Sequence, residues 1–219
     1  MTKYNFLIFR PIMITFTSRH HEIRKADLIT RKAHSVYPHI SESRVSAIIS
    51  QDKVKELFWG QMSLEYALKF AGERLKMEDD EKNLYTHVIE ALKNGLGNCA
   101  EEAKLAELIG KINGIKNIYS GSIFAGKGFA KHDVAFITNE NIEPNKKYKF
   151  KNKEALIIDP WLGITEFAGN YFKMIKTTFA KLLEIRGNSK PYIKPDFSCK
   201  LSQAKVKNYR KMYPELIIH

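Results

Sequence analysis

The chain has 219 residues, of which 44% are hydrophobic, 11% aromatic and 27% charged. These values are close to globular averages, so collagen, coiled-coil rods and wholesale disorder are excluded, and the length fits one domain with or without an extension. The formal net charge is +12, and residues 171–219 hold 11 Lys and Arg against three acids, which is +8 of that total. Such a field attracts nucleic acid, anionic lipid or an acidic protein surface, and it equally suits a solvated basic face.

The amino-terminal residues predict neither a membrane span nor a secretory signal. The apolar stretch Phe6-Leu7-Ile8-Phe9 is followed by Arg10 and Pro11, far short of the roughly 20 residues that a membrane-spanning helix needs. No apolar segment with a small-residue cleavage site follows the first five residues. We therefore expect no membrane span and a cytoplasmic location.

The first half of the chain is expected to be mainly helical. The pattern of residues 4–17 predicts an edge strand or two short strands around Pro11. The pattern of residues 22–94 predicts several helices, with a helix cap at Ser41 or Ser43. The last of these helices starts at three acids, residues 79–81. Its apolar face and its stop at Gly95 complete an amphipathic pattern, and residues 94–98 are rich in glycine and asparagine, which predicts a loop.

A second helix is expected to begin at about Cys99 and to end at Gly114. Asn98 is placed to cap it, and Glu101 and Glu102 lie in the first turn, where the helix dipole favours negative charge. Small residues continue the face that carries the thiol: Ala103, Ala106 and Gly110. They allow the helix to lie close against a sheet, so we expect the Cys99 thiol to point toward that sheet.

Three strands are predicted after this helix, at residues 118–124, 133–137 and 155–159, followed by a helix at about 170–186 and a tail containing Pro, Lys and Tyr. Polar, turn-rich residues separate the second and third strands. If these two strands form a hairpin with its turn at residues 144–147, His132 lies directly opposite Asp159, with β-carbons about 5 Å apart.

Cysteine-dependent catalysis needs a thiolate, an imidazole and a third group that orients the imidazole. Cys99 benefits from the helix amino terminus, which stabilises a negative charge. His132 is the only histidine between Cys99 and His219, and Asp159 is predicted to face it. Each residue also has a plainer interpretation: a buried apolar cysteine, a satisfied strand histidine and an ordinary strand end.

We expect no metal and no cofactor. Cys99 and Cys199 form no C-x-x-C pair, so neither a zinc ribbon nor a disulfide framework is predicted, and both thiols are expected to be reduced. Metal binding through Cys99 and His132 needs two further ligands, and no zinc-motif spacing supplies them.

Three segments resemble the core motifs of the transglutaminase-like superfamily. They are Gly97-Asn98-Cys99-Ala100-Glu101-Glu102-Ala103, Lys131-His132-Asp133-Val134-Ala135-Phe136 and Leu156-Ile157-Ile158-Asp159-Pro160-Trp161. The resemblance implies an α+β fold of papain-like architecture, in which a helix bearing the catalytic cysteine packs against an antiparallel sheet. It also implies that Cys99 is the nucleophile, His132 the base and acid, and Asp159 the residue that orients the imidazole.

The chain departs from the family pattern at several positions. Lys131 replaces the glycine that often precedes the histidine, Val134 stands where an aromatic residue is often found, and no tryptophan follows Cys99 as in papain-type peptidases. The calcium sites of animal transglutaminases have no recognisable counterpart. Candidates for an oxyanion hole or a site wall are Asn98, Gln61, Trp59 and Trp161.

The resemblance therefore implies a single catalytic domain with residues 1–94 as a mainly helical part, 95–165 as the Cys-His-Asp core and 166–219 as a basic extension. The expected activity is acyl transfer on protein amides, by cross-linking or deamidation, and peptidase activity is an alternative. The chain also resembles compact catalytic domains of bacterial effectors, which implies a host protein as substrate and delivery into a host cell. A third hypothesis is that the chain is a non-catalytic basic module, which binds nucleic acid non-specifically or binds an acidic partner.

Overall fold

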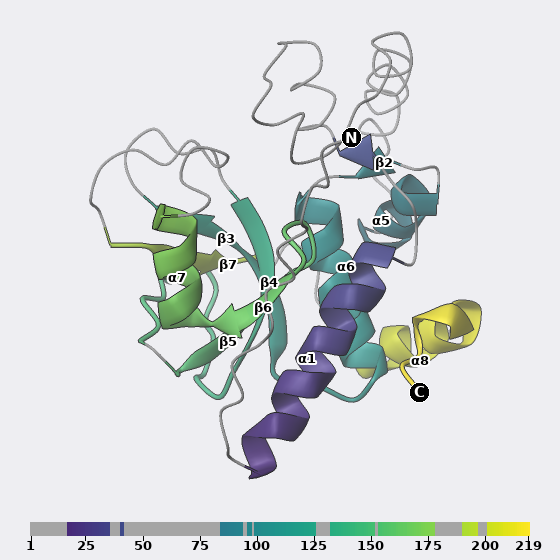
Figure 1. The fold of residues 1–219 in the computed structure, drawn as a ribbon. Helices are drawn as coiled ribbons and strands as arrows, with labels where there is room; N and C mark the ends of the chain where they lie inside the picture. The colour runs from purple at the N-terminus through teal and green to yellow at the C-terminus, as the bar shows by residue number, and fades with distance from the viewer. Residues whose placement is uncertain are drawn as a thin grey trace, which may run out of the picture.

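A computed structural model of the chain describes residues 17–35, 40–41, 84–93, 96–97, 99–125, 132–151, 153–177, 190–196 and 201–219 (Figure 1). The helices are α1 (Thr17–Ser35), α5 (Leu84–Lys93), α6 (Cys99–Ile112), α7 (Ala168–Thr177), α8 (Gln203–Met212) and a short 3-10 helix, η1 (Pro214–Leu216). The strands are β1 (Ile40–Ser41), β2 (Leu96–Gly97), β3 (Ile118–Phe124), β4 (His132–Thr138), β5 (Ala155–Asp159), β6 (Ile164–Phe167) and β7 (Tyr192–Pro195). The fold class is therefore mixed α+β.

The described part of the first half contains α1 and α5, in agreement with the helical prediction. The strands predicted at residues 4–17 fall outside the described residues, except for Thr17, which begins α1. Ser41, one of two predicted caps, lies instead in β1, which pairs in parallel with β2. The expected loop at 94–98 thus contains a short strand, which the glycine and asparagine content concealed.

Five strands form one antiparallel sheet in the order β6-β5-β4-β3-β7. The bounds of β3 and β5 agree with the sequence prediction, and β4 is one residue longer at each end. The strands β6 and β7 and the helix α8 were not predicted. Of the helix expected at 170–186, the described residues show α7, which begins earlier, at Ala168.

The predicted register between β4 and β5 is wrong by two residues. It would place Ala135 opposite Leu156, whereas Ala135 pairs with Ile158. Continued along the strands, this register puts Asp159 opposite Val134, so His132 and Asp159 are diagonal neighbours rather than direct partners. A shift of two residues keeps side chains on the same face, and diagonal pairs remain within reach of long side chains.

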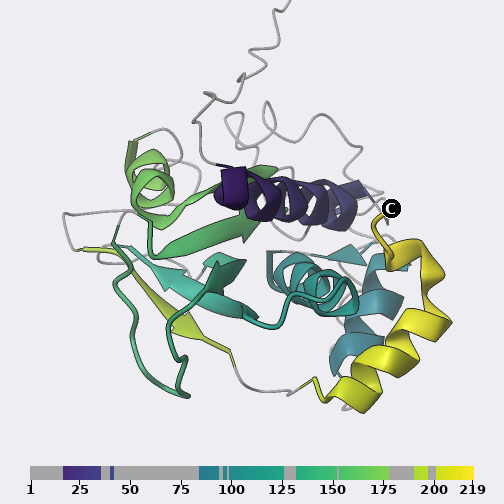
Figure 2. The ribbon, with the colours of Figure 1, turned by 90° about the horizontal axis from the view of Figure 1, so that it is seen from below.

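Both faces of the sheet are covered. One face packs against α1 and α6, and α5 packs on α6, through a cluster that includes Ile29, Ile89, Leu105, Leu108, Ile109, Ile118, Ala135, Ile137, Leu156 and Ile158. The other packs against α7 and the segment between β4 and β5 through Ile123, Val134, Phe136, Phe150, Ala155, Ile157, Tyr171 and Ile175. Figure 2 shows the sheet between α7 and α6. Because neighbouring residues of β4 enter opposite clusters, this strand is an uninterrupted buried run.

The helix α6 lies against the sheet as its small residues predict. Ala103 and Ala106 are fully buried, and a β-carbon added at Gly110 would lie 2.5 Å from Ile118 Cδ1. The helix ends at Ile112, and Gly114 follows with a φ of 86°, a left-handed conformation that favours glycine. This packing fixes the position of α6 on the sheet, and with it the position of Cys99, the first residue of the helix.

Candidate active site

The three residues proposed for catalysis come from three different elements. Cys99 is the first residue of α6, His132 the first of β4 and Asp159 the last of β5. Since β4 and β5 are antiparallel, the beginning of one and the end of the other lie at the same end of the sheet. His132 is 3% exposed and Asp159 is fully buried, whereas Cys99 is half-buried with a free thiol.

His132 and Asp159 form a direct contact. The distance between His132 Nε2 and Asp159 Oδ2 is 2.8 Å. A carboxylate only accepts hydrogen bonds, so Nε2 carries a hydrogen and donates a hydrogen bond to Asp159. The other ring nitrogen, Nδ1, is thereby left for Cys99.

Cys99 also interacts with the imidazole. Burial alone would lower the pKa of His132, but the charge and hydrogen bond of Asp159, together with a hydrogen bond and charge from Cys99, raise it well above the usual 6.5. The imidazole is therefore bracketed by a thiol and a carboxylate, and it is stabilised in its protonated form.

The turn after β5 orients the carboxylate of Asp159. Its Oδ1 accepts a hydrogen bond from Leu162 N at 3.1 Å, and Gly163 N donates to Pro160 O at 3.1 Å. Gly163 has a φ of 68°, which a residue with a side chain rarely adopts. The Asp-Pro ending thus belongs to a tight connection between β5 and β6.

Tyr171 is a contact of the site that the sequence analysis missed. Its hydroxyl donates to Asp159 Oδ2 at 2.5 Å, and the ring is fully buried. Burial, followed by the charge and hydrogen bond of Asp159 and the charge of Cys99, raises the pKa of Tyr171 well above 10.0. Tyr171 lies in α7, and no sequence spacing relates it to Asp159, so only the tertiary packing reveals it.

Trp161 packs against the imidazole. Its ring centre is 5.2 Å from that of His132, with 54° between the planes, and the residue is 8% exposed. It therefore lies where a site wall was expected. The other three candidates for the oxyanion hole or wall, Asn98, Gln61 and Trp59, lie outside the described residues.

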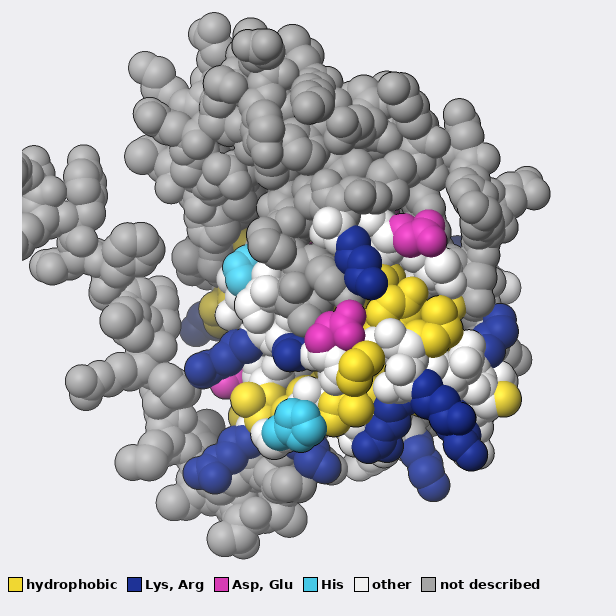
Figure 3. All heavy atoms as spheres, turned by 90° about the vertical axis from the view of Figure 1, so that its right-hand side faces the viewer, with side chains coloured by type: hydrophobic (Ala, Val, Ile, Leu, Met, Phe, Trp, Pro, Cys, Tyr) yellow, Lys and Arg dark blue, Asp and Glu magenta, His cyan; other side chains and the backbone are white. Residues whose placement is uncertain are grey.

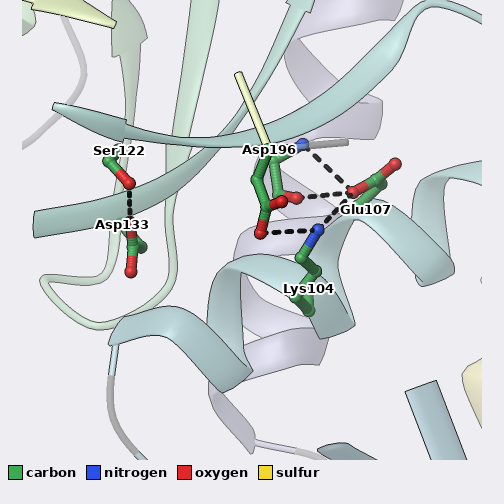
Figure 4. A network of polar contacts seen from close by, with 6 residues as sticks. Lys104, Glu107, Ser122, Asp133 and Asp196 are labelled. Carbon is green, nitrogen blue, oxygen red and sulfur yellow. Dashed lines mark hydrogen bonds and ion pairs between the residues drawn. The ribbon is translucent and has the colours of Figure 1, made fainter. Parts of the chain in front are cut away.

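A polar network, buried except at Asp196, anchors α6 to the sheet (Figure 4). Glu107 Oε2 accepts hydrogen bonds from Ser120 N at 3.1 Å and from Ser120 Oγ at 2.6 Å. Lys104 Nζ lies 3.8 Å from the same oxygen and 3.2 Å from Asp196 Oδ2, beyond the end of β7. These contacts join the helix to β3 and to the edge of the sheet.

A second polar contact lies on β4 beside His132. Ser122 Oγ donates to Asp133 Oδ1 at 2.5 Å across the β3–β4 pair. Asp133 shares the face of Ala135 and Ile137, so it points away from the face that carries His132. It therefore supports the strand that presents the imidazole without joining the Cys-His-Asp group.

The described residues contain no group of three or more His, Cys, Asp or Glu arranged to hold a metal ion. Among them, too, no helix combines the length and the apolar character needed to cross a bilayer. Cys199, the second thiol, lies outside the described residues.

Comparison of the chain with protein-family models, with curated proteins and with solved structures finds no significant match. The function is therefore inferred from the residues and their geometry. A half-buried thiol next to a protonated, carboxylate-bound imidazole can attack a carbonyl carbon and return a proton to the leaving group.

Proposed function

We propose that this chain is a transglutaminase-like cysteine acyltransferase of papain-like architecture, acting on amide groups of proteins. The observation that carries the proposal is the hydrogen bond of 2.8 Å between His132 Nε2 and Asp159 Oδ2, on an imidazole that lies near enough to Cys99 for the thiol to raise its pKa. The start of α6, which favours negative charge, adds support for a thiolate at Cys99.

The proposed reaction has two halves. The Cys99 thiolate attacks the amide carbonyl, the C–N bond breaks, and the His132 imidazolium gives its proton to the departing nitrogen. A thioester remains on Cys99. An amine or a water molecule then attacks the thioester, His132 accepts a proton from it, and the thiolate leaves. A lysine amine gives a cross-link, and water gives deamidation or, with a peptide bond, cleavage.

The remaining residues have supporting roles in this proposal. Asp159 orients the imidazole and stabilises its charge. The backbone N–H of Cys99, at the free amino end of α6, is a candidate donor to the oxyanion, and Asn98 is a second candidate. Trp161 covers one side of the imidazole. A host protein as substrate, and delivery into a host cell, remain proposals that depend on the resemblance to effector domains.

The proposal is tested with a glutamine-rich protein such as casein and a labelled primary amine. We expect label incorporation or ammonia release by the native chain, none by Cys99→Ala, and a rate lower by about tenfold or more for Asp159→Asn. Labelling or ammonia release that is equal in the native chain and in folded Cys99→Ala would contradict it.

A basic surface favours a second candidate function, the binding of an anionic partner. The helix α8 exposes Lys205, Lys207, Arg210 and Lys211 and contains no acidic residue. Lys and Arg side chains are spread over the face seen from the right of Figure 1, with hydrophobic side chains between them (Figure 3). Salt-sensitive retention on nucleic acid, unchanged in Cys99→Ala and lost when these four are replaced by Gln, would support binding.

A further inference from the structure

Two donors meet on one oxygen of Asp159. His132 Nε2 and the Tyr171 hydroxyl lie 2.8 and 2.5 Å from Oδ2, and Leu162 N lies 3.1 Å from Oδ1. Asp159 and Tyr171 are fully buried and His132 nearly so. The carboxylate is therefore held at both oxygens by donors from three different places in the fold: β4, α7 and the turn before β6.

The contact from Tyr171 is different in kind from the other two. Leu162 N belongs to the same turn as Asp159 and is close to it by chain connectivity, whereas Tyr171 reaches the carboxylate from a separate helix. α7 is fixed against the sheet by the burial of Ala168, Phe172 and Ile175. The hydroxyl is thus presented to Oδ2 by rigid packing.

We propose that Tyr171 is a positioning residue, whose hydroxyl fixes the orientation of the Asp159 carboxylate and takes up part of the negative charge that the carboxylate offers to His132. This inference rests on the proposed function for its catalytic meaning, because Tyr171 acts on the reacting sulfur only through Asp159 and His132. The described titratable groups that face Asp159 are His132 from β4, Tyr171 from α7 and, beyond the imidazole, Cys99 from α6.

The chemistry gives the direction of the effect. A hydrogen bond donated to a carboxylate stabilises its charge and reduces its attraction for other cations and donors. Without the Tyr171 hydroxyl, Oδ2 would keep His132 as its side-chain donor among the described residues and would attract the imidazolium more strongly. The imidazole would then keep its proton to a higher pH.

The test is an NMR titration of the His132 ring in chains that carry Cys99→Ala, so that no thiolate contributes. Adding Tyr171→Phe should move the midpoint upward by roughly half a pH unit or more. The matched control is Tyr148→Phe, which removes another buried hydroxyl from the same hydrophobic cluster. That hydroxyl accepts from Glu143 N and donates to Asn141 O, away from Asp159, so the midpoint should not move.

A second measurement needs no change at Tyr171. In the Cys99→Ala chain, the ¹³Cζ signal of Tyr171 should change with the midpoint of His132, because both groups share Oδ2. This readout holds even if Tyr171→Phe fails to fold. An unchanged or lowered His132 midpoint in a folded Tyr171→Phe chain, or a ¹³Cζ signal that ignores the His132 titration, would overturn the inference.

The outcome is separable from that of the proposed function. If the His132 midpoint depends on Tyr171 while Cys99 of the native chain shows no acyl transfer, the positioning contact is real and the acyltransferase proposal fails. If acyl transfer occurs and Tyr171→Phe leaves the His132 midpoint unchanged, as Tyr148→Phe does, the acyltransferase proposal is supported and the role of Tyr171 is structural.

Discussion

His132 combines burial with contacts on both sides of its ring, so its proton affects folding as well as chemistry. The pKa of His132 lies well above 6.5 in the folded chain despite burial, because Asp159 and Cys99 favour the protonated ring. In the unfolded chain the pKa returns to about 6.5. The stabilisation is therefore fully present below about pH 6.5 and is lost as the pH rises toward the folded-state value.

This difference predicts a slope in stability against pH. Above about pH 6.5, and below the pKa of the folded state, the free energy of unfolding should fall by about 1.4 kcal/mol per pH unit through this group alone. Urea unfolding of Cys99→Ala and of Cys99→Ala/His132→Gln at several pH values measures it. The difference between the two chains should shrink as the pH rises. A constant difference would contradict the assigned environment of His132.

The helix α6 connects the packing of the sheet to the position of the thiol. Gly110 is the point of closest approach, because an added β-carbon would lie 2.5 Å from Ile118 Cδ1 and 3.0 Å from Ile118 Cγ2. A larger side chain must push α6 away from β3 or force Ile118 from its rotamer. Either change also displaces the helix that carries Cys99.

We expect Gly110→Val to destabilise the fold by about 1–3 kcal/mol through overpacking. Shortening the opposing side chain with Ile118→Val removes Cδ1, so the double variant should regain part of the loss. Thermal or urea unfolding of the two single variants and the double variant gives the coupling between them. Strictly additive effects would show that α6 does not lie on Ile118 as described.

β5 and the middle of β4 were predictable because their residues are apolar on both faces. β3 and β5 have the predicted bounds, and the helix from Cys99 begins at its acidic first turn and ends just before Gly114, as predicted. The proximity of His132 and Asp159 follows from the pairing of β4 with β5. Because the two strands are antiparallel neighbours, the first residue of β4 and the last residue of β5 lie at the same end of the sheet. These signals suffice to predict that His132 and Asp159 lie close together.

The exact register was not predictable from a midpoint. The segment between β4 and β5 is not a simple turn: Ile142, Tyr148 and Phe150 are buried in the cluster that covers the sheet, and Tyr148 bridges to Ile193 of β7. Asn145 within it has a positive φ of 63°. Long-range packing of this segment therefore sets the pairing, and symmetry about residues 144–147 does not.

The elements that were missed depend on contacts distant in sequence. β7 is a four-residue strand that ends in Pro195, and its short, mixed sequence gains strand structure by pairing with β3 and by the bridge from Tyr148 to Ile193. Tyr171 similarly acquires its role by packing of α7 over β5. Neither contact leaves a spacing or a motif in the sequence.

The carboxyl-terminal segment is tied to the far end of α6. Asn113 Nδ2 donates to Ile109 O at 2.8 Å and to Leu216 O at 3.0 Å, and its Oδ1 accepts from Ile218 N at 2.9 Å. Tyr209 and Leu216 are buried beside the helix. One amide thus joins α6 to the end of a segment that carries much of the positive charge.

We expect Asn113→Ala to cost about 1–3 kcal/mol of stability and to expose the last residues to hydrogen exchange. The amide of Ile218 should lose its protection first. Asn208→Ala is a suitable control, because Asn208 is exposed and its side chain donates to Met212 Sδ within α8. The alkylation rate of Cys99 should remain unchanged, since Asn113 lies one helix length, about 20 Å, from the thiol. Equal exchange in both variants would refute this tie.

The Cys99–His132 pair is tested most directly by the rate of thiol alkylation against pH. Iodoacetamide should modify Cys99 of the native chain much faster than Cys199 near pH 6, and His132→Gln should abolish the difference, because the imidazolium no longer stabilises the thiolate. Mass spectrometry of the two cysteine peptides resolves the rates. A Cys99 that reacts no faster than Cys199 at this pH, or equally fast without His132, would contradict the account.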